Sequence, residues 1–438
     1  MTAAPKTPLV IADAPGGPHP SLYLPSLLDE FEVHAVWLAV EADGPRQRRA
    51  TALAAAVEAG GSVTAVTRPE DVRPVLSDVA ARTRAAGVLA FSERVVHLAQ
   101  RVAHGLGLPA NPPDVLDALQ DKRIQRARLH GGGLPTPRVV ELRDAADVRR
   151  AAATCPFPAV LKPSVGMGST ATFRVEHPGL LADAWQHARA LALADDRIAH
   201  HSPVMLLEEE LTGDPRWTEG GLGDYLSVEA LVVDGETHVL AVSDKLPLSL
   251  PYRENGHILP ALRPEAETAA AVAQVRAAHR ALGVRFGATH TEVKLTSGGP
   301  RIIEVNGRVG GSVPEQLLLV ADYDLPLNLA RLSVGDRPEV DVRCRRWSAY
   351  LTPQPPGGRH RVEVAPDAAA LRDVPGIRSV HHVVARDSVV DSADGTASNL
   401  VRVVAAVDHP QEIFTLAERL AGPDLFKLRR EGTGGESQ

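Results

Sequence analysis

Cysteine is nearly absent from this chain of 438 residues, which contains two, Cys155 and Cys344, far apart in the sequence. Neither a disulfide framework nor a cysteine metal site is therefore indicated, and both are expected to be ordinary core residues. An uninterrupted apolar run of about 18 residues, which a membrane-spanning helix needs, is also absent. Residues 1–8 lack the apolar core of a signal peptide. The sequence thus predicts a protein of the cytoplasm without a membrane partner.

An excess of positive charge is missing as well. The formal net charge is -7, and the arginines are interspersed with acids rather than gathered in a stripe. A nucleic-acid partner is therefore not expected, and a small-molecule partner is favoured. Lysine is scarce, with six residues in a Lys+Arg total of 47, which makes the position of each lysine informative.

The first hundred residues alternate short apolar runs with helical patterns. This βαβ rhythm predicts a parallel sheet, and we assign residues 1–110 to an N-terminal domain. The two glycines after the first run, Gly16 and Gly17, lack the G-x-G-x-x-G spacing of a dinucleotide site. The strand-like runs are 9–12, 33–40, 62–67 and 87–91, with a helical segment at 46–59.

The rest of the chain divides into two further predicted domains and a tail. A helix predicted over 113–128 leads into a second domain at 111–340, which includes a flap subdomain at about 135–205. A hairpin is predicted at the Asp234-Gly235 turn. Strand-like runs and a final helix predict an accessory domain at 341–430, followed by a disordered tail at 431–438.

The most specific pattern is a polar strand that follows a hairpin turn. Alternate strand residues share a face, so Glu304, Asn306 and Arg308 project to one side, and the hairpin brings Glu292 close to them. Two carboxylates and an amide carbonyl are hard oxygen ligands that suit Mg²⁺ together with substrate phosphates. Arg308 would then face a transferred phosphoryl group. A solvated polar strand edge is the alternative interpretation.

A second pattern places a lysine before a glycine-containing turn. An apolar strand delivers Lys162, and Gly166, Gly168 and Ser169 follow. Glycine N–H groups and an ammonium group can both bind phosphate oxygens. The turn is not a Walker loop, because G-x-x-x-x-G-K-[ST] is absent. An ordinary hairpin turn with a lysine reaching solvent is the alternative.

A third pattern is an apolar strand that ends in acids. Glu208, Glu209 and Glu210 precede Leu211. The default interpretation is an acidic strand end that faces solvent and has no binding function. However, a purine needs a backbone carbonyl, a backbone N–H and an acceptor for its exocyclic amine within an apolar slot, and such a strand end supplies them.

Along the chain, Asp121-Lys122 comes first, then Lys162 with its glycine turn, then the acidic strand end at 208–211, and last Glu292 with the polar strand at 304–308. This order resembles that of the ATP-grasp superfamily over residues 115 to 335. The layout is similar to that of bacterial L-amino acid ligases, which make dipeptides, and the run Glu-Val-Asn-Gly-Arg-Val-Gly-Gly at 304–311 is specific for that neighbourhood. The resemblance implies an α/β protein with an ATP-grasp fold, an N-terminal Rossmann-like pre-ATP-grasp domain and a C-terminal α+β accessory domain.

The resemblance also implies an ATP site. Lys122 and Lys162 would contact the phosphates or the adenine-side pocket, and residues 166–169 would form a flap over the phosphates. Residues 208–211 would hold adenine. The ribose-binding acid of the family is displaced here by an insertion, so Asp224 is the substitute that we assign.

Further roles follow from the same resemblance. Glu292, Glu304 and Asn306 match the magnesium ligands, which could also take Mn²⁺, and Arg308 matches the arginine that steadies the acyl phosphate and its tetrahedral successor. In related ligases Gly310, Gly311 and Ser312 shape the amino acid pocket, and the small Ser312 suggests extra room. The alternative for Ser312 is a capping box with Glu315 at the start of a helix.

A polar stretch lies at 244–257, with Asp244, Lys245, Tyr252, Arg253, Glu254 and His257. A charged surface loop is the commoner explanation for such a stretch, and a segment that covers the substrate is the alternative. We assign no role to the pair at 381–382, because adjacent strand residues point to opposite faces.

Together the motifs predict an ADP-forming ligase that joins two amino acids, as a dipeptide or a γ-glutamyl-type amide, through an acyl phosphate. Its partners would be small amino acid substrates, and a homodimer would be compatible with the accessory domain. An ATP-grasp ligase acting on another carboxylate and a non-catalytic nucleotide-binding module are the alternatives. Arg308 beside the metal ligands disfavours the module, which would not need it.

Overall fold

The N-terminal residues form a parallel sheet with helices on both faces. The computed structural model describes residues 5–195 and 204–431, so the predicted tail lies outside the description from residue 432 onward. Strands β1 (Thr7–Asp13), β2 (Phe31–Leu38), β3 (Ser62–Val66) and β4 (Gly87–Ala90) pair in the order β3-β2-β1-β4. They alternate with helices α1 (Pro20–Glu30), α2 (Asp43–Glu58), α3 (Pro69–Thr83) and α4 (Glu93–Gly105). The predicted βαβ rhythm is confirmed.

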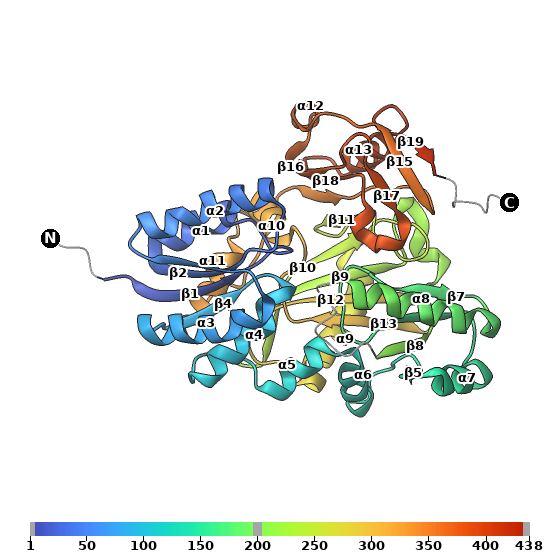
Figure 1. Ribbon diagram of the computed structural model, residues 1–438, viewed down its shortest axis with the longest axis horizontal. Coiled ribbons are helices and arrows are strands. Elements are labelled where there is room, and N and C mark those ends of the chain that lie inside the picture. Colours follow the sequence, from blue (N-terminus) through green and yellow to red (C-terminus); the bar gives the residue numbers. More distant parts are fainter. Residues whose placement is uncertain (1–4, 196–203, 432–438) are drawn as a thin grey trace.

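Both faces of this sheet are buried, as expected for parallel strands that read as continuous apolar runs. Leu9 and Ile11 of β1 pack with α1 and with the later helices α10 (Val313–Ala321) and α11 (Leu325–Ser333). Val10 and Ala12 pack with α3 and α4 on the other face. Figure 1 shows α1 and α11 on one side of the sheet and α3 and α4 on the other. Residues 313–333 are thereby fixed against the N-terminal sheet.

The helix predicted over 113–128 is two helices, α5 (Pro113–Gln120) and α6 (Lys122–Gly131). The prediction was wrong at Asp121, whose backbone is extended and whose side chain accepts a hydrogen bond from the Arg123 N–H. An aspartate in this position caps the second helix. The break places Lys122 in the first turn of α6, where its N–H donates to the Ser164 carbonyl.

The predicted flap is a small sheet of its own. Strands β5 (Val139–Leu142), β8 (Met205–Glu209), β6 (Ala159–Pro163) and β7 (Phe173–Val175) lie in that order, all antiparallel. Helices α7 (Ala145–Thr154) and α8 (Leu181–Ala194) cover it, with the short helix η1 (Pro178–Leu180) before α8. The loop between β6 and β7 carries the predicted glycine turn.

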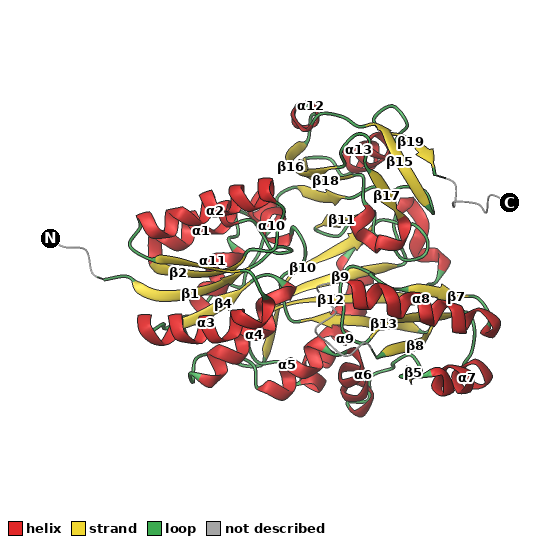
Figure 2. Ribbon diagram, viewed as in Figure 1, coloured by secondary structure: helices red, strands yellow, loops and turns green. Residues whose placement is uncertain are grey.

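The largest sheet runs through the middle of the molecule, where Figure 2 shows its strands in yellow. Its order is β13-β12-β9-β10-β11-β14-β18-β16 among the described residues. The predicted turn joins β9 to β10, with positive φ at both Asp234 and Gly235, as a tight hairpin requires. Strand bounds are β9 (Tyr225–Val233), β10 (Glu236–Lys245), β11 (Gly256–Leu259), β12 (Gly287–Thr296), β13 (Gly299–Asn306), β14 (Trp347–Leu351), β16 (Ile377–Val383) and β18 (Val401–Val407).

The C-terminal strands β14, β18 and β16 extend this sheet beyond β11, so the predicted boundary near residue 340 crosses a continuous sheet. Helix α9 (Glu265–Leu282) packs against the β9, β12 and β13 part of the sheet. A smaller sheet has the order β17-β15-β19. The remaining elements are η2 (Pro215–Gly221), α12 (Ala368–Arg372), α13 (Gln411–Ala421), β15 (Arg359–Val364), β17 (Val389–Asp391), η3 (Ser392–Ser398) and β19 (Lys427–Arg430).

Candidate active site

One cavity of about 390 Å³ collects most of the predicted site residues. It lies between the start of α4, the flap, the central sheet and the C-terminal residues. Asp224, Gly310 and Ser312 are not among the described residues that line it. The predicted residues that do line it are Lys122, Lys162, Gly166, Gly168, Ser169, Glu208, Glu209, Glu210, Leu211, Glu292, Glu304, Asn306, Arg308 and Gly311.

The oxygen donors come from the β12–β13 hairpin. Glu292 stands opposite Glu304 in the strand register, and His290 stands opposite Asn306. Burial would raise the pKa of Glu292, but the nearby Lys245, His290 and Arg308 outweigh burial and lower it. The expected clustering on one face thus follows from strand alternation and register.

This donor set fits Mg²⁺ only with help from a ligand. Within residues 5–195 and 204–431, no group of three or more His, Cys, Asp or Glu side chains is placed to hold a metal ion. Two carboxylates and an amide oxygen match the way Mg²⁺ is usually bound, by one or two carboxylates together with substrate phosphates. The residues therefore fit a metal that arrives with a nucleotide.

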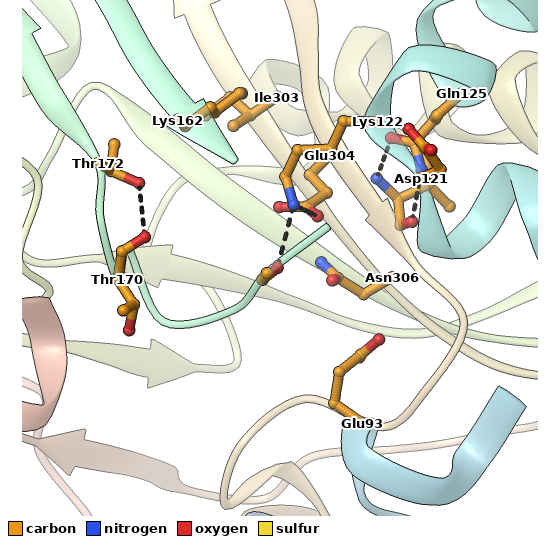
Figure 3. Close-up of polar contacts among 12 residues, drawn as sticks. Glu93, Asp121, Lys122, Gln125, Lys162, Thr170, Thr172, Ile303, Glu304 and Asn306 are labelled. Carbon is orange, nitrogen blue, oxygen red and sulfur yellow. Dashed lines mark hydrogen bonds and ion pairs between the residues drawn. The ribbon is translucent and has the colours of Figure 1, made fainter. Parts of the chain in front are cut away.

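Lys122 links three parts of the cavity wall. Its Nζ lies 2.8 Å from Glu304 Oε1 and donates to the Gly166 carbonyl at 3.0 Å. Figure 3 shows this side chain between the β13 carboxylate and the flap loop, with Asn306 beside Glu304. The ammonium group therefore stands where a phosphate, a metal-binding carboxylate and the flap would meet.

Glu208 is buried between two cations. Its carboxylate lies 2.6 Å from Lys162 Nζ and 3.1 Å from Arg126 Nε. Burial would raise its pKa, but Arg126 and Lys162 hold it at about 2. Burial also lowers the pKa of Lys162 against the pull of Glu208. Both oxygens of the Glu208 carboxylate are therefore already paired with cations.

Glu210 joins the flap to the following loop. Its carboxylate accepts hydrogen bonds from Arg174 Nε of β7 at 2.9 Å and from the Tyr252 hydroxyl at 2.8 Å. Asp224, the predicted ribose ligand, accepts instead from Lys294 Nζ at 2.7 Å. The structure brings Lys294 to the cavity wall and leaves Asp224 behind it.

Arg308 is held by a residue that sequence reasoning missed. Glu93, in the first turn of α4, accepts from Arg308 Nε at 2.8 Å and lies 3.0 Å from His97 Nε2. Burial would raise the Glu93 pKa, but the His97 hydrogen bond and the charges of His97, Arg308 and Lys122 hold it at about 2. The sequence signal was a Ser92-Glu93 helix start, in which Ser92 caps α4. An ionised carboxylate thus fixes the guanidinium in the cavity.

We expect Glu93→Gln to flatten the loss of stability in acid. In the wild type, the pKa of Glu93 is lower in the folded chain than its ordinary 4.5, so ionised Glu93 stabilises the fold above pH 4.5. This contribution is lost as the pH falls toward 2. Between about pH 5 and pH 3 the wild-type Tm should fall more than that of the variant. The exposed Glu418, replaced in the same way, is the control, and equal falls in wild type and Glu93→Gln would contradict the ion pair.

Most of the charged and polar side chains that we singled out at 244–257 are buried, and Glu254 is half-buried, so their interpretation as a charged surface loop was wrong. Lys245 is only 1% exposed and lies 2.7 Å from Glu254 and 3.5 Å from Glu292. The cause is the pairing of β10 with β11, which carries Lys245 and His257 into the sheet. Lys245, Tyr252, Glu254 and His257 all line the cavity, which supports the alternative that this segment covers a substrate.

Two buried histidines beside the cavity carry different charges. Burial lowers the pKa of His257 to about 3, so it is neutral at pH 7, and its Nε2 lies 2.7 Å from Gln316 Oε1. Burial would also lower the pKa of His290, but Glu229, 2.7 Å away, outweighs burial and raises it to about 9. A Cβ at Gly310 would lie 2.6 Å from Val313 and 2.8 Å from both Glu229 and His290, so these side chains would have to shift to admit one.

Ser312 precedes α10 without the predicted capping box. Its φ of 57° is left-handed, and its side chain makes no capping hydrogen bond. Glu315 is instead bound by Ser379 and by His381, whose Nε2 lies 2.7 Å away. The capping-box alternative was wrong, because Glu315 binds residues of β16 instead, and this contact gives His381 a structural role that we had not assigned. Tyr350, unlike Ser312, is among the described residues that line the cavity.

Comparison with known proteins places this hairpin and flap in a family. Residues 155–315 match the family model described as "ATP-grasp domain". The chain contains an ATP-grasp domain. The crystal structure of L-amino acid ligase from Bacillus licheniformis superposes with a TM-score of 0.77 and 20% identity, covering 98% of this chain and 100% of that one. The predicted fold class is therefore confirmed.

Two curated relatives align with just over half of this chain. Human carnosine synthase 1 is 28% identical over 280 residues, which are 59% of this chain and 32% of that protein. Alanine--anticapsin ligase of Bacillus subtilis (strain 168) is 24% identical over 247 residues, which are 55% of this chain and 52% of that protein. The chain thus spans about half or less of the length of these relatives. Separately, no helix in the described part of the chain is long and apolar enough to cross a membrane.

Proposed function

We propose that the protein is an ATP-dependent carboxylate–amine ligase that joins two amino acids through an acyl phosphate. The observation that carries the proposal is the convergence of Lys122, Lys162, Glu304, Asn306 and Arg308 on one cavity beneath a glycine loop. Cations for phosphates, oxygen donors for a metal and an arginine for the transferred group are the parts that phosphoryl transfer requires. Similarity to alanine--anticapsin ligase and carnosine synthase 1 supports amino acids as the substrates.

In the first step an oxygen of the substrate carboxylate attacks the γ-phosphorus of ATP, and ADP leaves. Mg²⁺, held by Glu292, Glu304 and Asn306, would neutralise phosphate charge and orient the phosphates. Lys122, whose Nζ lies 2.8 Å from Glu304, would offer its ammonium group to a phosphate oxygen beside these ligands. Arg308, fixed by Glu93, would stabilise the negative charge of the transferring phosphoryl group.

In the second step the amine nitrogen of the other amino acid attacks the acyl carbon. The C–N bond forms, the bond from the acyl carbon to the phosphate oxygen breaks, inorganic phosphate leaves, and the amine gives up a proton. Water would compete with the amine for the acyl phosphate, so the Gly166–Ser169 loop has the task of excluding it. Within this scheme no enzyme nucleophile is needed.

The test is phosphate release from Mg-ATP across a matrix of paired amino acids, with mass spectrometry of the products. We expect release only when two amino acids are present, with one condensed product, and loss of that release when EDTA removes the metal. Silence across the matrix despite ATP binding would refute amino acid joining and favour another carboxylate or amine. Release that does not depend on any amine would instead indicate kinase-like or hydrolytic chemistry.

A further inference from the structure

The Gly166–Ser169 loop is held from three directions. Lys122 Nζ of α6 donates to the Gly166 carbonyl, and Ser169 Oγ donates to the Tyr252 carbonyl at 2.9 Å. The third contact comes from η3, where the Thr396 N–H donates to the Gly168 carbonyl at 3.2 Å. The loop that would lie over the phosphates is thus bound by a segment more than 220 residues later in the chain.

The contact with η3 is backbone against backbone. Gly395 has φ of 64° and ψ of −144°, a conformation that is essentially restricted to glycine. A Cβ at this position would lie 2.8 Å from the Gly168 carbonyl oxygen and 3.0 Å from the Ser169 backbone. Such close approach leaves no room for a side chain, so the turn at Gly395 is fitted to the loop.

Thr396 also connects this turn to the Glu254 segment of the cavity wall. It lines the cavity, and its hydroxyl accepts a hydrogen bond from the Glu254 N–H at 3.3 Å. Gln354 Nε2 donates to both the Thr396 and the Glu254 carbonyls, at 3.3 and 2.8 Å. The glycine loop, the C-terminal turn and the Glu254 segment therefore form one hydrogen-bonded unit.

We propose that the Gly395-Thr396 turn is a positioning element for the phosphate loop, through which the C-terminal residues hold that loop over the nucleotide. The proposal rests on the proposed function, since it takes the cavity to bind ATP and to protect an acyl phosphate. Loss of the turn would let the loop open during the lifetime of the acyl phosphate, and water would then compete with the amine.

The test compares Gly395→Ala with Gly358→Ala. Gly358 also has a positive φ, of 93°, but a Cβ there would meet nothing closer than Arg430 at 4.0 Å. Both variants therefore carry backbone strain in the C-terminal residues, but only the new methyl group of Gly395→Ala clashes with the Gly166–Ser169 loop. Thr396→Val, which removes the hydroxyl acceptor while keeping the backbone, is a second variant, and Thr396→Ser should restore its behaviour.

The first readout is hydrogen exchange of peptides covering 164–172 and 392–398, with a non-hydrolysable ATP analogue bound. We expect exchange about tenfold faster in Gly395→Ala, the change given by losing one hydrogen bond of about 1.4 kcal/mol. Thr396→Val should also exchange faster, and Gly358→Ala should match wild type. Wild-type exchange in both Gly395→Ala and Thr396→Val, or equal acceleration in Gly358→Ala, would overturn the proposal.

The second readout is the ratio of phosphate released to amide formed. Wild type should stay near one phosphate per amide, and Gly395→Ala should exceed it because water reaches the intermediate. If wild type forms no amide, the proposed function fails, while the exchange measurement still decides whether the turn holds the loop. If Gly395→Ala still releases one phosphate per amide and its hydrogen exchange matches wild type, the proposed role of the turn is refuted. The proposed ligase function would not be affected by that result.

Discussion

Replacing Arg308 with alanine is expected to lower kcat for amino-acid-dependent ADP formation by about 10²-fold or more. A preorganised donor aimed at developing charge contributes an effect of this size in other enzymes, because it is oriented before the reaction begins. Glu93 supplies that orientation here, through the 2.8 Å contact with Arg308 Nε. The loss should fall mainly on kcat, since the charge that Arg308 meets develops in the transition state.

Arg301 provides the matched control for this prediction. It lies on β13, the strand that ends two residues before Arg308, and carries the same charge, but it is not among the described residues that line the cavity. Arg301→Ala should keep kcat within about twofold of wild type, as expected of a substitution away from the chemistry. If both variants keep near-wild-type kcat, Arg308 has no role in the transition state and the assigned site is wrong.

Glu208→Ala is expected to destabilise the fold by about 3–5 kcal/mol, the usual cost of removing one partner from a buried ion pair. Glu208 is 4% exposed and is shared by Lys162 and Arg126, so both cations lose their anion at once. Because burial already lowers the pKa of Lys162, the variant should lower it further. The measurement is the urea midpoint of unfolding without nucleotide.

The next residue on the strand is the control for this second prediction. Glu209 has the same charge, but it is exposed, and its carboxylate accepts a 3.3 Å hydrogen bond from the Arg138 N–H rather than lying between two cations. Glu209→Ala should change stability by less than about 1 kcal/mol. Equal urea midpoints for the two variants would show that the Lys162–Glu208–Arg126 group does not stabilise the flap.

The parts of the site that the sequence predicted are those that local geometry fixes. Glu292, Glu304 and Asn306 sit on one hairpin, so strand alternation and a short turn determine that they share a face. Lys162 and Gly168 are similarly joined by one loop. No long-range information is needed in either case.

The parts that the sequence could not predict depend on contacts between distant segments. Glu93 meets Arg308 across 215 residues, and Thr396 meets Gly168 because η3 folds back onto the flap. In the sequence Lys245 resembled a surface charge. Its burial could not be predicted, because it depends on the pairing of β10 with β11 within the central sheet. The pattern of polar residues in that segment does not reveal which charges will find partners.

The most direct test of the account is transfer of oxygen from the substrate carboxylate to phosphate. The amino acid that is activated would be labelled with ¹⁸O in its carboxylate and turned over with Mg-ATP and the amine substrate. An acyl phosphate intermediate predicts that one labelled oxygen appears in the released inorganic phosphate, because the acyl carbon breaks its bond to that oxygen. Phosphate without label, formed together with the amide, would contradict carboxylate activation by phosphoryl transfer.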